Sequence, residues 1–129
     1  MKRKHSLRFN IGVADLARAA EFFTAIGFQQ DSQMPSAMVR VVLPDGSYIM
    51  LFPHETMAQF LPVEYENSRT EVLISIGVES ADDVVAIIEK VEAAGGTVTA
   101  PPMEFNGFYG AGFTDLDGHH FNLLVVPKS

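Results

Sequence analysis

Residues 9–13 read FNIGV and residues 74–78 read ISIGV, so the chain contains the same short pattern twice. Apolar side chains alternate with polar or small ones in both copies, as is typical of a β-strand with one buried face. Apolar residues at helical spacing follow each copy, over 15–27 and over 80–96. Ser80 is a residue type favoured at helix N-termini. The sequence thus predicts a strand followed by a helix, used twice.

A second pair of matching segments closes each copy. Residues 45–51 read DGSYIML and residues 117–123 read DGHHFNL, and an Asp-Gly pair is typical of a hairpin turn that opens a strand. Further elements are predicted between these segments: strands at 28–32, 37–43, 97–100 and 108–114, and a short helix at 54–61. Each copy is therefore a β-α-β-β-β module, and the predicted fold class is α+β.

The length of 129 residues favours one compact domain that spans the whole chain. Within it we predict the first module at 7–62, a linker at 63–71 and the second module at 72–127. The polar, unpatterned composition of the linker separates it from both modules.

Charge and cysteine content exclude several classes of function. The chain has 16 acidic and 9 basic side chains, a balance that disfavours nucleic-acid binding. It has no cysteine, which excludes thiolate catalysis and cysteine metal sites. No apolar run is long enough to span a bilayer or to form the core of a signal peptide. We therefore expect a cytoplasmic protein with neither a nucleic-acid nor a membrane partner.

Strand alternation predicts which side chains share a face. Ile49, Leu51, Phe121 and Leu123 in the closing strands are expected to lie under the helices. The opposite face of the opening and closing strands mixes polar and apolar side chains: Arg8, Asn10, Tyr48, Met50, His120 and Asn122. Such a mixture is typical of a pocket wall, so we predict a binding site for a small molecule there.

The sequence resembles the vicinal oxygen chelate superfamily, which contains glyoxalase I, extradiol dioxygenases and the fosfomycin and bleomycin resistance proteins. The segments that carry the resemblance are FNIGVADL at 9–16, FF at 22–23, IGF at 26–28, FYG at 108–110 and FTDLDGH at 113–119. The chain looks most like short bacterial proteins of the predicted lactoylglutathione lyase branch. The resemblance implies that the two modules form a curved mixed sheet, an incomplete barrel with helices outside, and that two chains pair as a homodimer.

Superfamily members that are enzymes hold a divalent metal ion with His, Glu or Gln from the first and last strands of each module. The resemblance places these positions at Arg8, Met50, Leu73 and Asn122. A guanidinium cation and a leucine do not coordinate metals, a thioether is a soft ligand, and an asparagine carbonyl is a weak neutral one. We therefore expect no metal ion and no cofactor, and whether the chain is an enzyme stays open.

Individual residues in the predicted site allow more than one interpretation. His119 and His120 point to opposite faces of a strand and cannot chelate one ion together, but His120 is the one candidate catalytic residue, as a general base. Arg8 is either a surface ion-pair partner or a clamp for an anionic ligand. Tyr109, in a glycine-rich aromatic stretch, either packs or forms part of a lid.

Three functions compete. The leading hypothesis is a metal-independent protein that binds a small aromatic or anionic organic molecule, in a pocket lined by Arg8, Asn10, Tyr48, Met50, Tyr109, His120 and Asn122. The first alternative is a metal-dependent lyase, isomerase or dioxygenase of the lactoylglutathione lyase type with non-standard ligands, for which His5 and His54 are available. The second alternative is an interaction module with a degenerate pocket.

Overall fold

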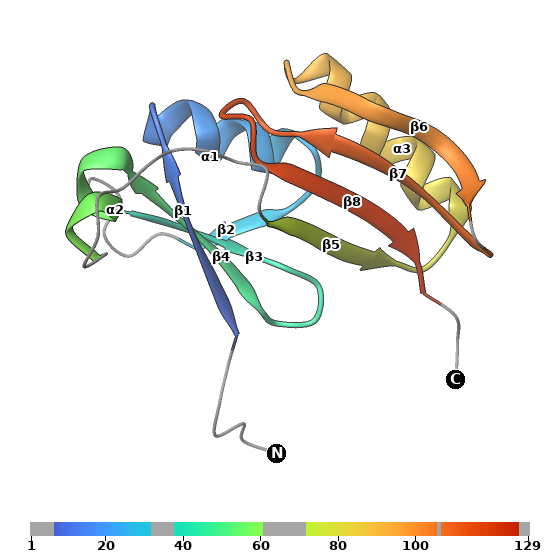
Figure 1. Cartoon of the computed structure of the whole chain (residues 1–129), viewed down its shortest axis with the longest axis horizontal. Coiled ribbons are helices and arrows are strands. Elements are labelled where there is room, and N and C mark those ends of the chain that lie inside the picture. The colour runs from blue at the N-terminus through green and yellow to red at the C-terminus, as the bar shows by residue number, and fades with distance from the viewer. Residues whose placement is uncertain (1–6, 32–37, 61–71, 106, 127–129) are drawn as a thin grey trace. The chain divides into compact units, whose positions relative to one another are not determined.

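The structure is a computed structural model that describes residues 7–31, 38–60, 72–105 and 107–126 (Figure 1). The chain divides into two compact units, one comprising Met1–Thr24 and Phe28–Asn67, the other comprising Ala25–Gly27 and Ser68–Ser129. The predicted linker at 63–71 and the candidate ligand His5 lie outside the described residues.

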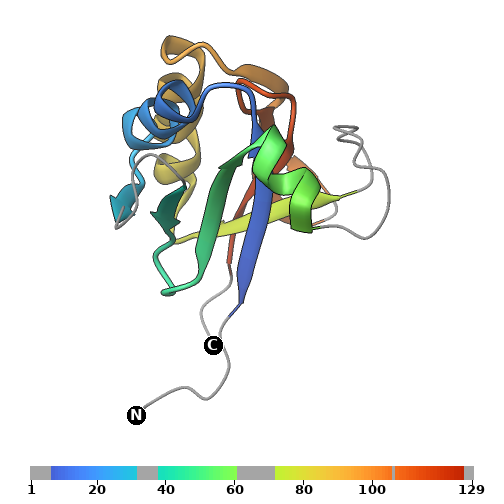
Figure 2. The ribbon, with the colours of Figure 1, turned by 90° about the vertical axis from the view of Figure 1, so that its left-hand side faces the viewer.

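The first module follows the predicted order of elements. It contains β1 (Arg8–Val13), α1 (Leu16–Ala25), β2 (Gln29–Asp31), β3 (Val39–Val42), β4 (Tyr48–Pro53) and α2 (His54–Phe60). The strand order is β1-β4-β3-β2, with β1 parallel to β4 and the other pairs antiparallel. Figure 2 shows β1 and β4 side by side, and α2 contacts both strands.

The second module repeats this arrangement. It contains β5 (Leu73–Val78), α3 (Ala81–Ala93), β6 (Thr97–Phe105), β7 (Phe108–Thr114) and β8 (His120–Val125). Its strand order, β5-β8-β7-β6, corresponds strand for strand to that of the first module, again with one parallel pair. The predicted α+β class with two β-α-β-β-β modules is confirmed. Each module forms its own open, four-stranded mixed sheet.

The ends of α3 follow from local sequence. The side chain of Ser80 accepts a hydrogen bond from the backbone N–H of Asp83, which satisfies one of the free donors at the start of the helix. The helix ends before Gly95, whose φ of +95° suits glycine. Its apolar side contacts β6, β7 and β8 (Figure 1). Within the described stretches, no helix combines the length and apolar composition that a membrane span requires.

The buried face of each sheet is the predicted one. Ile49 and Leu51 of β4, and Phe121 and Leu123 of β8, are at most 1% exposed. Phe113 of β7 is the register partner of Phe121, and their rings stack with centroids 5.2 Å apart. Burying each such side chain contributes about 1.5–3 kcal/mol to stability.

β6 is longer than the predicted 97–100 and continues to Phe105. Its pairing with β7 shifts register between Val98 and Ala100 and again between Ala100 and Met103. Two prolines follow Ala100, and a strand accommodates prolines at a sheet edge, where β6 lies. The bulges interrupt the alternation of side chains, so the sequence pattern did not predict the second half of the strand.

Candidate ligand-binding site

A pocket of about 580 Å³ opens on the sheet of the second module. Its lining comes from β6, β7 and β8, and all of these strands belong to one compact unit. The volume lies within the range of about 300–1,000 Å³ that is usual for small-molecule sites.

Two rows of residues in register across the three strands build the pocket. The rows are Ala100–Gly112–Asn122 and Met103–Gly110–Leu124. Register partners on neighbouring strands project to the same face of a sheet. In both rows the residues of β6 and β8 carry side chains and the central residue of β7 is glycine. The pocket is therefore a hollow over β7 with walls on either side.

At both glycines of β7, a side chain would collide with neighbouring atoms as well as fill part of the pocket. A Cβ atom added to Gly110 would lie 2.2 Å from the backbone carbonyl oxygen of Leu123. A Cβ atom added to Gly112 would lie 2.7 Å from Oγ1 of Thr99. Both distances are shorter than van der Waals contact, and the first involves backbone, which cannot rotate away. The hollow is thus a property of the backbone of β7.

The apolar side chains beside the hollow remain accessible. Met103 is 48% exposed and Phe108 is 45% exposed, and both line the pocket. An aromatic ring and a thioether are polarizable surfaces on which a flat ring can pack. The pocket therefore offers contacts suited to an aromatic molecule.

Asn122 is the polar side chain among the residues that line the pocket. Its Oδ1 atom is buried and has no hydrogen-bond partner among the described residues. Buried acceptors without partners are rare in folded proteins and point to a missing group. Asn122 is one of the residues that the sequence analysis predicted for the site.

The corresponding place in the first module is filled. Arg40 of β3 occupies the register position that Gly112 occupies in β7. The Cζ atom of Arg40 lies 4.8 Å from the centre of the Tyr48 ring, and its guanidinium forms an ion pair with Asp31. β3 of the first module thus carries a long side chain at the register position where β7 of the second module carries a glycine.

The four predicted residues of the first module lie on one face of its sheet. Arg8 is in register with Tyr48, and Asn10 is in register with Met50. The Cζ atom of Arg8 lies 5.1 Å from the centre of the Tyr48 ring, a cation–π contact. Arg8 and Asn10 are exposed, whereas Met50 is buried. The structure therefore places these four residues on one face of the β1–β4 pair, with the polar side chains more exposed than Met50.

The three predicted residues of the second module have different places. Asn122 lines the pocket. His120 lies on the same face one row away, opposite Thr114 and beyond the pocket lining. Tyr109 alternates with Phe108 and Gly110 along β7, so its side chain projects to the other face of the sheet. The aromatic residue that β7 presents to the pocket is Phe108.

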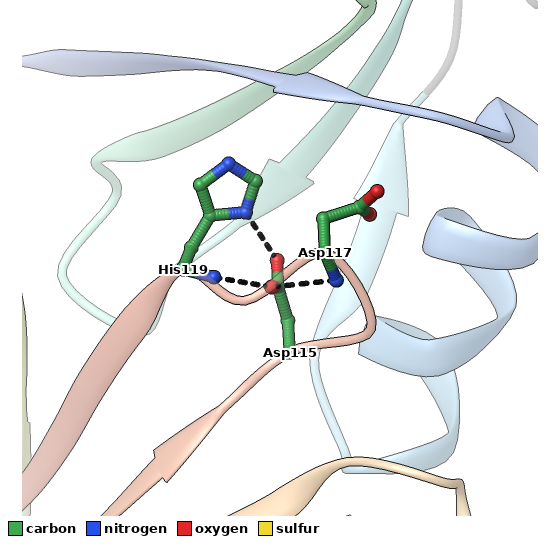
Figure 3. Close-up of polar contacts among 3 residues, drawn as sticks. All are labelled: Asp115, Asp117 and His119. Atoms are coloured by element: carbon green, nitrogen blue, oxygen red, sulfur yellow. Dashed lines mark hydrogen bonds and ion pairs between the residues drawn. The ribbon is translucent and has the colours of Figure 1, made fainter. Parts of the chain in front are cut away.

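Asp115 organises the turn between β7 and β8 (Figure 3). It is 5% exposed, and its Oδ1 accepts hydrogen bonds from the backbone N–H groups of Asp117 at 3.0 Å and His119 at 2.8 Å. Its Oδ2 lies 2.8 Å from Nδ1 of His119. Both contacts of His119 with Asp115 lie within this turn, so His119 helps to hold the turn.

The donor set does not fit the divalent metal ion that the resemblance implies. The four corresponding positions carry Arg8, Met50, Leu73 and Asn122, among which only Asn122 offers an oxygen. Leu73 is 57% exposed and has no donor atom. In the part of the chain that the structure describes, no three His, Asp or Glu side chains gather closely enough to hold an ion.

Sequence reasoning missed the wall of the pocket on β6 and the role of the glycines. The signal for the glycines is present, because Gly110 and Gly112 are two residues apart in a strand and so leave the same face bare. No comparable signal marks Met103, because the register shifts on both sides of Ala100 remove the period of two.

Comparison with known proteins shows which family the sequence matches. The sequence model of the Glyoxalase/Bleomycin resistance protein/Dioxygenase superfamily matches residues 5–123. No curated protein matches the chain.

Solved structures agree with this match. A hypothetical protein from S. aureus is 36% identical, with 97% of this chain and 96% of that chain covered and a TM-score of 0.86. A glyoxalase-related enzyme from Fulvimarina pelagi is 18% identical, with 97% and 90% covered and a TM-score of 0.84. A lactoylglutathione lyase from Agrobacterium tumefaciens is 14% identical, with 97% and 96% covered and a TM-score of 0.70. The last two show a shared fold alone.

Proposed function

Since this chain belongs to the Glyoxalase/Bleomycin resistance protein/Dioxygenase superfamily, we propose that it binds a small aromatic organic molecule and needs no metal ion to do so. The binding site is the pocket over β7. The observation that carries this proposal is the hollow of about 580 Å³ that Gly110 and Gly112 open between the walls on β6 and β8.

The chemistry of the lining favours an aromatic ligand. Phe108, Met103 and Leu124 provide apolar surfaces, and the backbone of two glycines provides a floor without side chains. A flat ring placed there gains contact on its face and its edges. Such a ligand buries apolar area at little conformational cost, because the pocket is already open.

An anionic ligand, the other part of the sequence-based hypothesis, receives its support from the first module. Arg8 and Arg40 both lie against the ring of Tyr48, and a guanidinium recognises carboxylates and phosphonates well. The described residues that line the pocket over β7 carry no charge. The pocket itself therefore favours the aromatic option.

The competing function is metal-dependent chemistry of the lactoylglutathione lyase type. It would need ligands at positions other than those that carry Arg8, Met50, Leu73 and Asn122. Because the family contains enzymes, the test below also measures metal content and turnover. The homodimer that the resemblance implies stays a prediction.

The test of the proposed function compares a variant that fills the pocket with a matched control. We expect Ala100→Leu to weaken binding of 2-naphthol about tenfold or more, because the added side chain occupies space between the walls. Ala86→Leu makes the same change on the exposed side of α3 and should leave the affinity unchanged. Binding is followed by naphthalene fluorescence in the full chain, which contains no tryptophan.

The same preparations separate binding from metal-dependent catalysis. Metal content is measured by mass spectrometry after purification without chelator, together with turnover of the hemithioacetal of methylglyoxal and glutathione. We expect 2-naphthol affinity to be the same with and without EDTA. A stoichiometric metal ion together with turnover would overturn the proposal, as would equal affinities in the Ala100→Leu and Ala86→Leu chains.

A further inference from the structure

We propose that the ligand of the pocket over β7 is an uncharged aromatic molecule that donates one hydrogen bond to Oδ1 of Asn122. This inference rests on the proposed function and adds the chemical class of the ligand. Asn122 then acts as a residue that determines specificity rather than as a metal ligand.

The first argument concerns the unpartnered acceptor. Oδ1 of Asn122 is buried and has no hydrogen-bond partner among the described residues. In this side-chain conformation the atom is shielded from bulk water, so its loss of hydration on folding is uncompensated. A ligand with an O–H or N–H group supplies the missing donor, whereas an otherwise identical ligand without one does not.

The second argument concerns the position of the acceptor. Asn122 stands in the wall of the pocket on β8, in the same row as Gly112 and Ala100. The terminal torsion of an asparagine side chain is soft, so a rotation of the amide can turn Oδ1 towards a donor held in the pocket. A ring that packs over the glycines can therefore place one polar substituent against this amide.

The third argument concerns charge. The described residues that line the pocket are apolar apart from Asn122, whose amide is neutral. A carboxylate placed there would lose its hydration without gaining a cation. The pocket should therefore prefer a neutral hydroxyl or N–H group to an anionic group on the same ring system. Hydroxylated or N–H-bearing fused aromatic rings belong to this class.

The experiment compares three probes that share one ring system. They are 2-naphthol, 2-methylnaphthalene and 2-naphthoate, which differ in a single substituent: a neutral donor, an apolar group and an anion. We expect the full chain to bind 2-naphthol about tenfold or more tightly than 2-methylnaphthalene, because only the hydroxyl satisfies the buried acceptor. We also expect 2-naphthoate to bind more weakly than 2-naphthol.

Two variants assign the preference to Asn122. Asn122→Leu should bind 2-naphthol and 2-methylnaphthalene with equal affinity, because the acceptor is gone while the pocket keeps its shape. Gln29→Leu also replaces a side-chain amide by leucine, at an exposed position of β2 outside the pocket and the predicted site, and should keep the full preference. Urea unfolding of both variants checks that they fold. If Asn122→Leu does not fold, the ranking of the three probes on the unchanged chain decides alone.

The outcomes separate this inference from the proposed function. Equal binding of 2-naphthol and 2-methylnaphthalene, or a preference that survives Asn122→Leu, overturns the role of Asn122 while the pocket stands. Tightest binding by 2-naphthoate overturns the uncharged class. If none of the three probes binds, the proposed function fails, and this inference fails with it.

Discussion

At the scale of single residues, Asp115 shows how two copies of one turn have diverged. Leu43 holds the corresponding position in the first module. The backbone N–H of Leu43 donates to the carbonyl of Ser47 at 2.9 Å, and that of Asp115 donates to the carbonyl of His119 at 3.2 Å. Leu43 has no side-chain acceptor, whereas the carboxylate of Asp115 accepts from two backbone N–H groups and lies beside a ring nitrogen (Figure 3). The second turn is therefore held by a buried carboxylate.

We expect Asp115→Ala to lower the free energy of unfolding by about 2–4 kcal/mol, as measured by urea denaturation. The change leaves the N–H groups of Asp117 and His119 without their acceptor in a part-buried turn, and each orphaned donor carries a desolvation cost. Asp45→Ala is the control, because Asp45 binds Ser47 in the matching turn at an exposed site. It should cost less than about 1 kcal/mol. Equal losses would contradict a special role for Asp115.

At the scale of secondary-structure elements, β7 contributes to the core with one face and to the pocket with the other. Ala111 and Phe113 are buried on the face that bears the core. Gly110 and Gly112 form the floor of the pocket on the other face. Because successive side chains of a strand alternate, one strand serves both faces without compromise.

We expect Gly110→Ala to destabilise the fold by about 3 kcal/mol or more, since its Cβ would lie 2.2 Å from the carbonyl oxygen of Leu123. Gly107→Ala is the comparison. At Gly107 φ is +85° and nothing lies within 4 Å of an added Cβ, so only backbone strain of about 1–2 kcal/mol applies. Thermal and urea unfolding measure both. A cost at Gly110 no larger than that at Gly107 would show that the strands can separate to admit a methyl group.

At the scale of the whole molecule, two modules with the same topology present different surfaces. Each sheet has an equivalent strand order and one parallel pair. The first module has Arg40 against Tyr48, and the second has Gly112, which carries no side chain, at the equivalent position. The same topology thus occurs twice, and the two modules differ at one register position, which carries Arg40 in the first and Gly112 in the second.

We expect ligand protection to be confined to the second module. With 2-naphthol at about ten times its Kd, amide hydrogen exchange that proceeds by opening of β6, β7 and β8 should slow about tenfold, because the ligand binds only the closed form. Exchange in β1, β3 and β4 should not change. Hydrogen exchange followed by mass spectrometry on the full chain measures both. Equal protection in both modules would contradict a site built from the second module.

The order of elements along the chain, the turns and most helix ends could be predicted from the sequence because they depend on neighbours along the chain. Repeated alternation identified the paired strands, Asp-Gly identified the hairpins, and Ser80 identified the start of α3. The same local rules separated the buried face of β4 and β8 from the open face. They also placed Asn122 on the face that carries the pocket.

The composition of the pocket depended on contacts between segments that are distant in the sequence. Bulges in β6 bring Met103 opposite Gly110, and no local pattern records where an edge strand shifts its register. Arg40 was not predicted, because its place against Tyr48 follows from pairing of β3 with β4. The alternation of apolar and polar residues can be read along the chain. The volume of a pocket and the hydrogen-bond partners of a buried oxygen are determined only when distant strands pack together.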